Sequence, residues 1–118
     1  MAIARLLSQE YFNVSVYILE NGIADMRDIY RADFIEQHLM WTHRAIEEGV
    51  DIRGYFYWSL LDNFEWSKGF WPRFGLVEID YKTLERKIRP FNGQPARYSR
   101  FSSAFASGLF VTRPALPS

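Results

Sequence analysis

Two apolar runs in the chain predict strands, and each of them ends in polar residues. Residues 13–19 are apolar at nearly every position and end at Glu20-Asn21-Gly22, where Asn-Gly is a strong turn signal. An unbroken run of this kind is typical of a strand buried on both faces of a parallel sheet. The second run covers residues 52–61 and ends at Asp62-Asn63. Both ends are therefore candidates for functional side chains.

A helix is predicted between the two strands. Apolar side chains recur at helical spacing over residues 32–48. Asp28 or Asp33 could cap the start of this helix, and Gly49 is placed to end it. The order strand, helix, strand predicts a βαβ unit, in which the two strands run parallel.

The remaining pattern predicts a loop and a hairpin. Residues 64–72 form an aromatic-rich loop, and residues 74–80 have the composition of a short strand. A turn at 81–83 then leads into residues 84–88, which return as the hairpin partner. Farther on, residues 101–110 are expected to form one short helix.

Composition narrows the class of protein. The 118 residues are 48% hydrophobic and 24% charged, which is typical of one globular domain. A formal net charge of zero argues against a nucleic-acid binder. The chain has no cysteine, no apolar run long enough for a bilayer and no signal-peptide core in its first residues. We therefore expect a cytoplasmic protein with no nucleic-acid partner and no membrane partner.

Candidate chemistry gathers at the two strand ends. Parallel strands present their carboxyl ends at one edge of a sheet, so Glu20, Asn63, Glu65 and Trp66 should face one cavity. Position alone leaves Glu20 either as a functional carboxylate or as a strand-end side chain that reaches solvent or a structural arginine. Glu65 is either functional or a solvated loop charge. A carboxylate pair of Glu20 with Glu65 or Asp62 would fit glycoside hydrolysis.

Aromatic and histidine side chains are open to more than one interpretation. Aromatic residues make up 18% of the chain, and Trp58, Trp66 and Trp71 are expected either to fill the core or to stack on sugar rings. His38 and His43 lie five residues apart, which is not the spacing of a helical metal pair. We expect no metal site and no cofactor.

Several segments together resemble glycoside hydrolase family 1. They are Tyr17-Ile18-Leu19-Glu20-Asn21-Gly22, His38-Leu39, Gly54-Tyr55, Trp58-Ser59-Leu60-Leu61-Asp62-Asn63-Phe64-Glu65-Trp66, Gly69-Phe70 and Arg73-Phe74-Gly75-Leu76. The resemblance runs from about Val16 to Pro90, and the Trp-to-Trp segment is its most specific part. It implies an α/β chain that forms part of a (β/α)8 TIM barrel, with about strands 7 and 8 and a β-hairpin loop. The division is then a lead-in at 1–12, the barrel segment at 13–90 and a divergent tail at 91–118.

The resemblance also implies a role for each site residue. Glu20 aligns with the nucleophile of a retaining β-glycosidase, and Trp58 with the indole under the sugar. Glu65 aligns with the carboxylate that accepts from the 4- and 6-hydroxyls, so it holds the sugar and is not the catalytic partner of Glu20. Trp66 aligns with the donor to the 3-hydroxyl, and Phe74 with an aromatic that lines the pocket. The implied substrate is a terminal β-linked, non-phosphorylated sugar, as in β-glucosidases.

The chain departs from the family pattern in three places. Leu19 stands where the family usually has Thr, and the family's acid/base motif, Asn-Glu-Pro, does not occur. The residues after Arg89-Pro90 do not resemble the family's closing helix. The segment is therefore expected to need the missing N-terminal barrel portion as its partner and to be inactive alone. The alternative is a non-catalytic carbohydrate-binding or structural remnant of such an enzyme.

Overall fold

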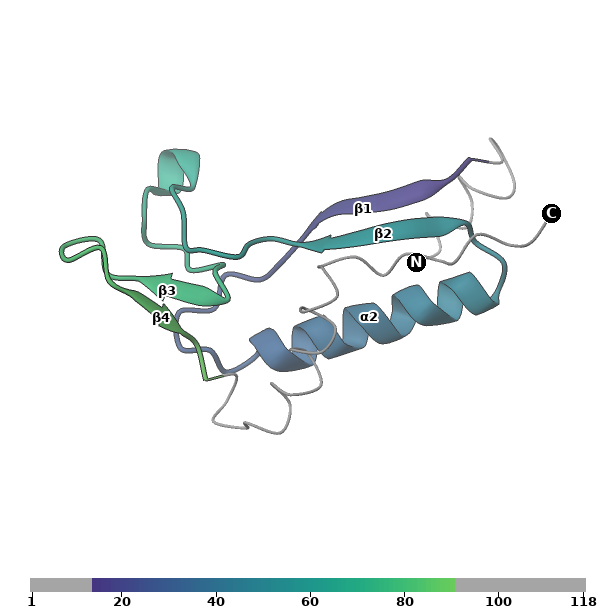
Figure 1. The fold of residues 1–118 in the computed structure, drawn as a ribbon, viewed down its shortest axis with the longest axis horizontal. Helices are drawn as coiled ribbons and strands as arrows, with labels where there is room; N and C mark the ends of the chain where they lie inside the picture. Colours follow the sequence, from purple (N-terminus) through teal and green to yellow (C-terminus); the bar gives the residue numbers. More distant parts are fainter. Residues whose placement is uncertain (1–13, 91–118) are drawn as a thin grey trace.

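The computed structural model describes residues 14–90, which form one βαβ unit followed by a loop and a hairpin (Figure 1). The unit consists of strand β1 (Val16–Asn21), helix α2 (Arg31–Glu47) and strand β2 (Ile52–Tyr57). A single 3-10 turn, η2 (Trp66–Lys68), lies in the loop. The hairpin pairs β3 (Val77–Ile79) with β4 (Arg86–Ile88) in antiparallel register. The predicted order of elements is confirmed.

One buried layer holds the βαβ unit together. β1 and β2 are parallel, as predicted, and α2 lies along one face of the pair (Figure 1). The side chains between them form two hydrophobic clusters. They are Ala32, Ile35, Tyr55, Tyr57 and Leu76 in one cluster, and Ala45, Val50 and Ile52 in the other. This layer fixes the strand ends relative to the helix.

The predicted start of helix α2 differs from the structure, whereas its predicted end agrees with it. Neither Asp28 nor Asp33 caps the start, so that prediction is wrong. Oδ2 of Asp25 instead accepts hydrogen bonds from the backbone N–H of Arg31, at 3.1 Å, and of the residue before it, at 2.6 Å. The predicted end is confirmed, since Gly49 adopts φ 93°, which favours glycine.

β1 is not buried on both faces within the described chain. Val16 and Ile18 pack toward the core, whereas Tyr17 is 54% exposed and Leu19 is 69% exposed. The expectation of two buried faces is wrong here because, within residues 14–90, α2 covers only one face of the strand pair (Figure 1). An apolar strand in this environment exposes the face that a larger sheet or barrel would cover.

β2 ends at Tyr57, four residues before the predicted end at residue 61. Its last ladder partner is Asn21, the final residue of β1, so β2 has no strand to pair with beyond that point. Leu61 instead makes an isolated bridge with Val77 of the hairpin. The chain after Tyr57 therefore crosses from the βαβ unit to the hairpin, and the site lies along this crossing.

The predicted strands at 74–80 and 84–88 are shorter in the structure but form the expected hairpin. Asp80 closes its turn, because Oδ1 accepts from the backbone N–H of Lys82 at 2.8 Å and of Thr83 at 3.3 Å. The expected lead-in at 1–12, the tail at 91–118 and the short helix at 101–110 lie outside the described residues. Within residues 14–90, no helix has the length and apolar character needed to cross a membrane.

Candidate active site

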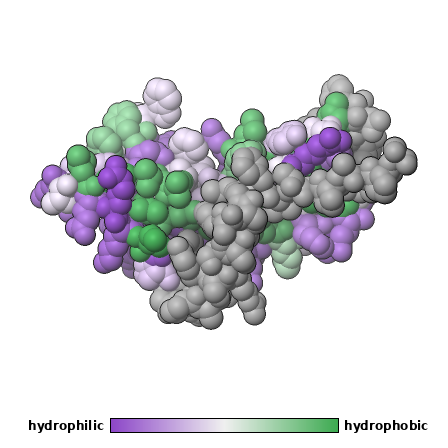
Figure 2. Space-filling model, in the orientation of Figure 1, coloured by the Kyte–Doolittle hydropathy of each residue, from purple (hydrophilic) through white to green (hydrophobic). Residues whose placement is uncertain are grey.

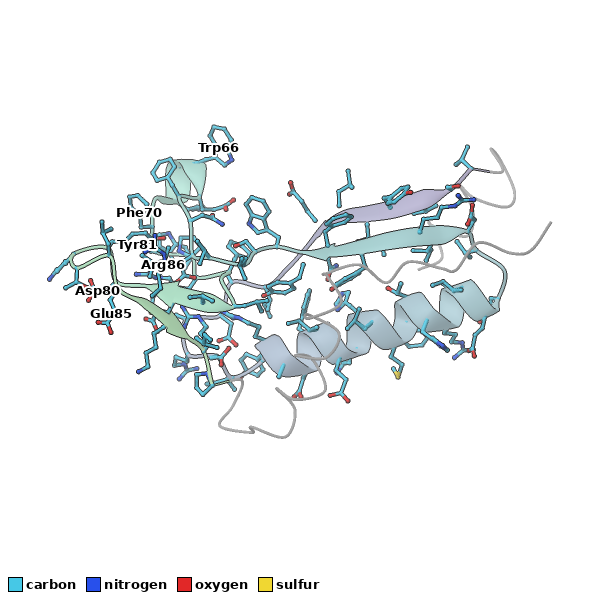
Figure 3. All side chains as sticks on the ribbon, in the orientation of Figure 1. Trp66, Phe70, Asp80, Tyr81, Glu85 and Arg86 are labelled. Atoms are coloured by element: carbon cyan, nitrogen blue, oxygen red, sulfur yellow. The ribbon has the colours of Figure 1, made fainter. Side chains whose placement is uncertain are left out.

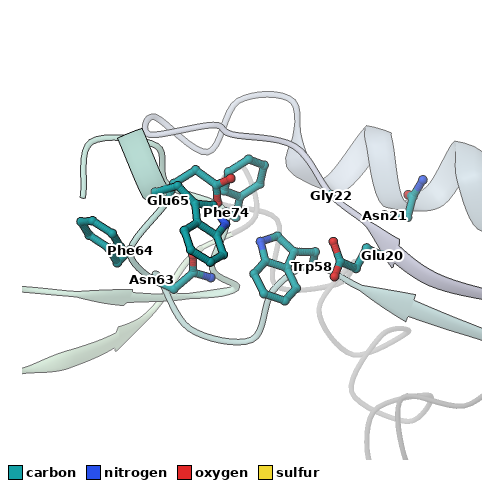
Figure 4. A pocket seen from close by; sticks show the side chains of 9 residues that line it. Glu20, Asn21, Gly22, Trp58, Asn63, Phe64, Glu65 and Phe74 are labelled. Atoms are coloured by element: carbon teal, nitrogen blue, oxygen red, sulfur yellow. The ribbon is translucent and has the colours of Figure 1, made fainter. Parts of the chain in front are cut away.

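A cavity of about 530 Å³ lies where β1 and β2 end and the aromatic loop begins (Figure 4). This volume is in the range of small-molecule sites. Its lining comes from the end of β1, the residue after β2, and the loop between residues 62 and 75. The lining residues are Glu20, Asn21, Gly22, Trp58, Asn63, Phe64, Glu65, Trp66 and Phe74. Every residue to which the resemblance assigns a role therefore lines one cavity, whereas Asp62 does not.

Glu20 and Trp58 form the side of the cavity nearest the strands. Glu20 is exposed, and its carboxylate points toward the Trp58 indole (Figure 4). The backbone N–H of Trp58 donates to the carbonyl of Asn21 at 3.0 Å. A Cβ on Gly22 would lie 1.8 Å from the carbonyl oxygen of Trp58, so only glycine permits this approach. The turn after β1 thus places the indole beside the carboxylate.

A buried tyrosine braces the end of β1 from the helix side. The Tyr55 hydroxyl donates to Oδ1 of Asn21 at 2.7 Å. Burial first, and the neighbouring Tyr57 second, raise the pKa of the Tyr55 hydroxyl. The hydroxyl therefore keeps its proton and remains a donor. Asn21, the residue after Glu20, is held to β2 through both its side chain and its main chain.

The opposite side of the cavity is a loop with its own hydrogen bonds. The backbone N–H of Glu65 donates to the carbonyl of Gly69 at 2.8 Å, and Lys68 N–H donates back to the carbonyl of Glu65 at 2.8 Å. Gly69 adopts φ 63°, which favours glycine. Asn63 Nδ2 donates to the Ser59 hydroxyl at 2.8 Å. Glu65 is therefore presented on a closed turn.

The tryptophans do not fill a core in the described chain. Trp58, Trp66 and Trp71 are 38%, 81% and 62% exposed, so the core interpretation is wrong for all three. Figure 2 shows hydrophobic side chains on the surface at the hairpin end, among hydrophilic ones. In Figure 3, Trp66 projects from the loop, and the Phe70 ring lies against Tyr81 at 4.3 Å between centroids.

Asp62 is the residue that departs most from expectation. Its side chain is fully buried and lies within 3.2 Å of Arg73 and 2.9 Å of Arg89. It does not line the cavity, so the pairing of Glu20 with Asp62 is wrong.

Glu20 and Glu65 both line the cavity. Asn21, Gly22 and Phe64 line it as well, and no role in the site was predicted for Gly22 or Phe64. Their adjacency to Glu20 and Glu65 was the available signal.

The histidines have local partners. His38 Nδ1 lies 2.7 Å from the carbonyl oxygen of Phe34, and the exposed His43 lies 3.6 Å from Glu47. Residues 14–90 contain no cluster of three side chains able to hold a metal ion.

Comparison with known proteins identifies the family. A profile described as Glycosyl hydrolase family 1 matches residues 2–94. The chain belongs to glycosyl hydrolase family 1. The resemblance drawn from the Trp58–Trp66 segment is thereby confirmed.

Relatives in this family are similar in sequence and in structure. A β-galactosidase from Sulfolobus acidocaldarius is 49% identical over 79 residues, which are 67% of this chain and 16% of that protein. The solved β-glycosidase from Pyrococcus horikoshii aligns with TM-score 0.70 and 53% identity, covering 75% of this chain and 21% of that one. The β-glucosidase from Thermotoga maritima, solved with deoxynojirimycin, aligns with TM-score 0.72 and 37% identity, covering 86% and 25%.

The family 1 chain spans only part of its relatives. It covers about a sixth to a fifth of the length of the curated proteins it matches. The solved family 1 enzymes are TIM barrels, and the described residues form a partial segment with few strands. The α/β fold class and its relation to a barrel are thus confirmed, while the numbering of its strands within that barrel is not.

Proposed function

We propose that this family 1 chain is the C-terminal segment of a retaining, β-glucosidase-like β-glycosidase, with β1 and β2 as strands 7 and 8 of the barrel. The observation that carries the proposal is the cavity itself. It joins Glu20 from the end of one strand to Trp58, Glu65 and Phe74, which are 38 to 54 residues away in sequence. A carboxylate facing an indole, with a second carboxylate across the cavity, fits a sugar, whose ring carries several hydroxyls and one electrophilic anomeric carbon.

In the proposed reaction, Glu20 is the nucleophile. Its carboxylate attacks the anomeric carbon as the bond to the leaving-group oxygen breaks, and a protonated Glu from outside this chain protonates that oxygen. The same outside residue then takes a proton from water, which attacks the glycosyl-enzyme. This step releases the sugar with retained configuration and restores Glu20. A retaining mechanism requires the two carboxyl groups to be about 5–5.5 Å apart.

The other cavity residues would hold the sugar. Trp58 lies beside Glu20 and is proposed to support the ring from below. Glu65 lies across the cavity and is proposed to accept from the 4- and 6-hydroxyls, while Trp66 N–H donates to the 3-hydroxyl. Phe74 would complete the apolar wall. A carboxylate at Glu65 repels a phosphate, which supports a non-phosphorylated sugar.

The relatives support this class of substrate. The three relatives described above are named for β-galactosidase, β-glycosidase and β-glucosidase activities. We propose a terminal β-linked sugar as the substrate and the N-terminal part of a barrel as the necessary partner. A cytoplasmic location, and the absence of nucleic-acid and membrane partners, remain part of the proposal.

The test joins the full 118-residue chain, in place of the corresponding segment, to the N-terminal part of the Thermotoga maritima β-glucosidase. We expect this fusion to hydrolyse para-nitrophenyl β-glucoside. Glu20→Gln should lower kcat by at least about 10³-fold, because the attacking carboxylate is lost. Glu85→Gln, in the exposed hairpin turn, is the matched control and should leave kcat unchanged.

The unfused chain should show no turnover. Loss of the acid/base residue alone typically costs about 10²–10⁴-fold, and most of the pocket is also missing. A folded fusion that binds glucose, measured by tryptophan fluorescence, but does not turn over would favour the non-catalytic alternative. Turnover by the unfused chain that vanishes in Glu20→Gln would contradict the need for a barrel partner.

A further inference from the structure

We propose that Asp62 is a positioning residue for the sugar-holding side of the cavity. Its buried carboxylate ties together the two ends of the loop that carries Glu65 and Phe74. The inference rests on the proposed function and extends it to a residue that would not touch the sugar. The residue roles implied by the family resemblance do not include Asp62.

Four donors converge on the two oxygens of Asp62. Oδ1 accepts from the backbone N–H of Gly75 at 2.9 Å. Oδ2 accepts from Arg89 Nη2 at 2.9 Å, from Arg73 Nη1 at 3.2 Å and from the backbone N–H of Ile79 at 3.4 Å. The Asp62 side chain has no exposed area. These donors belong to the far end of the loop, to β3 and to the residue after β4.

This arrangement brings two distant parts of the cavity wall together. Asp62 immediately precedes the lining residues Asn63 to Trp66, and Gly75 immediately follows the lining residue Phe74. The two backbones are in direct contact, since a Cβ on Gly75 would lie 2.3 Å from the amide nitrogen of Asp62. The carboxylate therefore sets the separation between Glu65 and Phe74.

The nucleophile side of the cavity is placed by other contacts. Glu20 and Trp58 are fixed by the turn at Gly22 and by the bond between Tyr55 and Asn21. None of these contacts involves Asp62. A disturbance at Asp62 should therefore act on the recognition of remote hydroxyls more than on attack at the anomeric carbon.

The buried charges explain why a carboxylate is needed. The Arg89 side chain is 3% exposed and the Arg73 side chain 20% exposed, and both donate to the same oxygen. An amide at position 62 would leave these guanidinium groups without a buried anionic acceptor, which is costly. Arg73 and Arg89 would keep their bonds to the carbonyls of Ile79 and Gly75, but the loop end would shift because the anion that holds both arginines is lost.

The experiment uses the fusion of the full chain with two substrates, para-nitrophenyl β-glucoside and β-xyloside. The xyloside lacks the hydroxymethyl group, so it lacks one hydroxyl that Glu65 is proposed to bind. We expect Asp62→Asn to lower kcat/KM for the glucoside by about 10-fold or more, as for loss of a hydrogen bond to a charged group. The value for the xyloside should fall less than about threefold, so the preference for glucoside decreases.

A purely structural role gives a different result. If Asp62 only stabilised the fold, both substrates would lose activity by the same factor and the ratio would stay constant. That outcome would overturn the inference. The matched control is Glu78→Gln, because Glu78 also contacts Arg89, at 3.7 Å, but is 49% exposed and outside the loop. It should leave the ratio unchanged.

A second variant keeps the inference testable if Asp62→Asn does not fold. Arg73→Gln removes one donor to Asp62 and leaves Arg89 in place, so the substrate ratio should shift in the same direction by a smaller factor. An unchanged ratio in this folded variant would contradict the inference alone. A parent fusion without turnover would contradict the proposed function and this inference with it.

Discussion

Two glycines allow main-chain contacts that no other residue would permit at those positions. Gly22 brings the turn after β1 against the carbonyl of Trp58, and Gly75 brings the hairpin against the amide of Asp62. The first contact places the indole beside Glu20, and the second sets the opposite wall. At the scale of single residues, the width of the cavity therefore depends on both positions having no Cβ atom.

Gly22→Ala tests the first of these contacts. The added Cβ would meet the Trp58 carbonyl at 1.8 Å, so the backbone must move. We expect the free energy of unfolding of the fusion to fall by about 1–3 kcal/mol, measured by urea denaturation, as for other overpacked sites. Glucose-dependent quenching of tryptophan fluorescence should also weaken, because Trp58 moves.

The control for this substitution is Ala24→Ser, two residues farther along the same turn and exposed. It should change neither the free energy of unfolding nor the quenching. If Gly22→Ala behaved like Ala24→Ser, the close approach to Trp58 would have no energetic weight.

At the scale of elements, the start of α2 is tied to the loop that precedes the hairpin. Arg31, the first residue of the helix, has no exposed area. Its guanidinium donates to the carbonyls of Asp25 at 2.7 Å, Arg73 at 2.8 Å and Gly75 at 3.3 Å. The helix therefore supports not only the strands but also the segment on both sides of Phe74.

Asp25→Ala tests how much the cap contributes to this junction. The substitution removes the acceptor of two N–H groups at the start of α2 and should lower the free energy of unfolding by about 0.5–2 kcal/mol. Asp33→Ala removes the same charge from the first turn of the helix without removing the cap, and should cost less, within about 1 kcal/mol. Urea denaturation of the two variants provides the measurement. Equal losses would mean that charge, and not the hydrogen bonds, accounts for the effect.

At the scale of the whole molecule, the described chain has one buried layer and one open face. The layer between α2 and the strands contains the core, while Tyr17, Leu19 and Trp58 on the other side are exposed. Large apolar side chains exposed together on one face are typical of a surface that a partner covers. The asymmetry supports the proposal that further barrel strands cover this face.

The buried layer also predicts how stability depends on pH. Burial is the largest cause that raises the pKa of both Tyr55 and Tyr57 in the folded chain. Tyrosines in the unfolded chain ionise at about pH 10. The folded state therefore binds these protons more tightly, and its stabilisation is complete below about pH 10 and decreases above it.

We expect the free energy of unfolding of the fusion to decrease between about pH 10 and about pH 12, measured by urea denaturation. Tyr55→Phe should make this decrease smaller, because the variant has one fewer buried proton to lose. Tyr30→Phe, at a position 58% exposed, should leave the slope unchanged. A slope that is the same in all three proteins would contradict the assignment to Tyr55.

The expectations that held depend on residues close together in the chain. The order of strand, helix, strand and hairpin follows from apolar periodicity and from turn residues such as Gly49, which act over a few positions. The spacing from Trp58 to Trp66 likewise identified the family, because nine consecutive residues carry the pattern. These features are written into the local sequence, so no tertiary contact is needed to recognise them.

The expectations that failed depend on contacts between distant residues. Asp62 resembled a cavity carboxylate, but the fold buries it against donors up to 27 residues away, such as Arg89. Asp25 caps the helix from outside the predicted segment, and β2 ends where β1 leaves it unpaired. The sequence alone thus determined which elements form and which family they belong to. The tertiary structure decided which carboxylates face the cavity, because that depends on which donors the fold brings within hydrogen-bond distance.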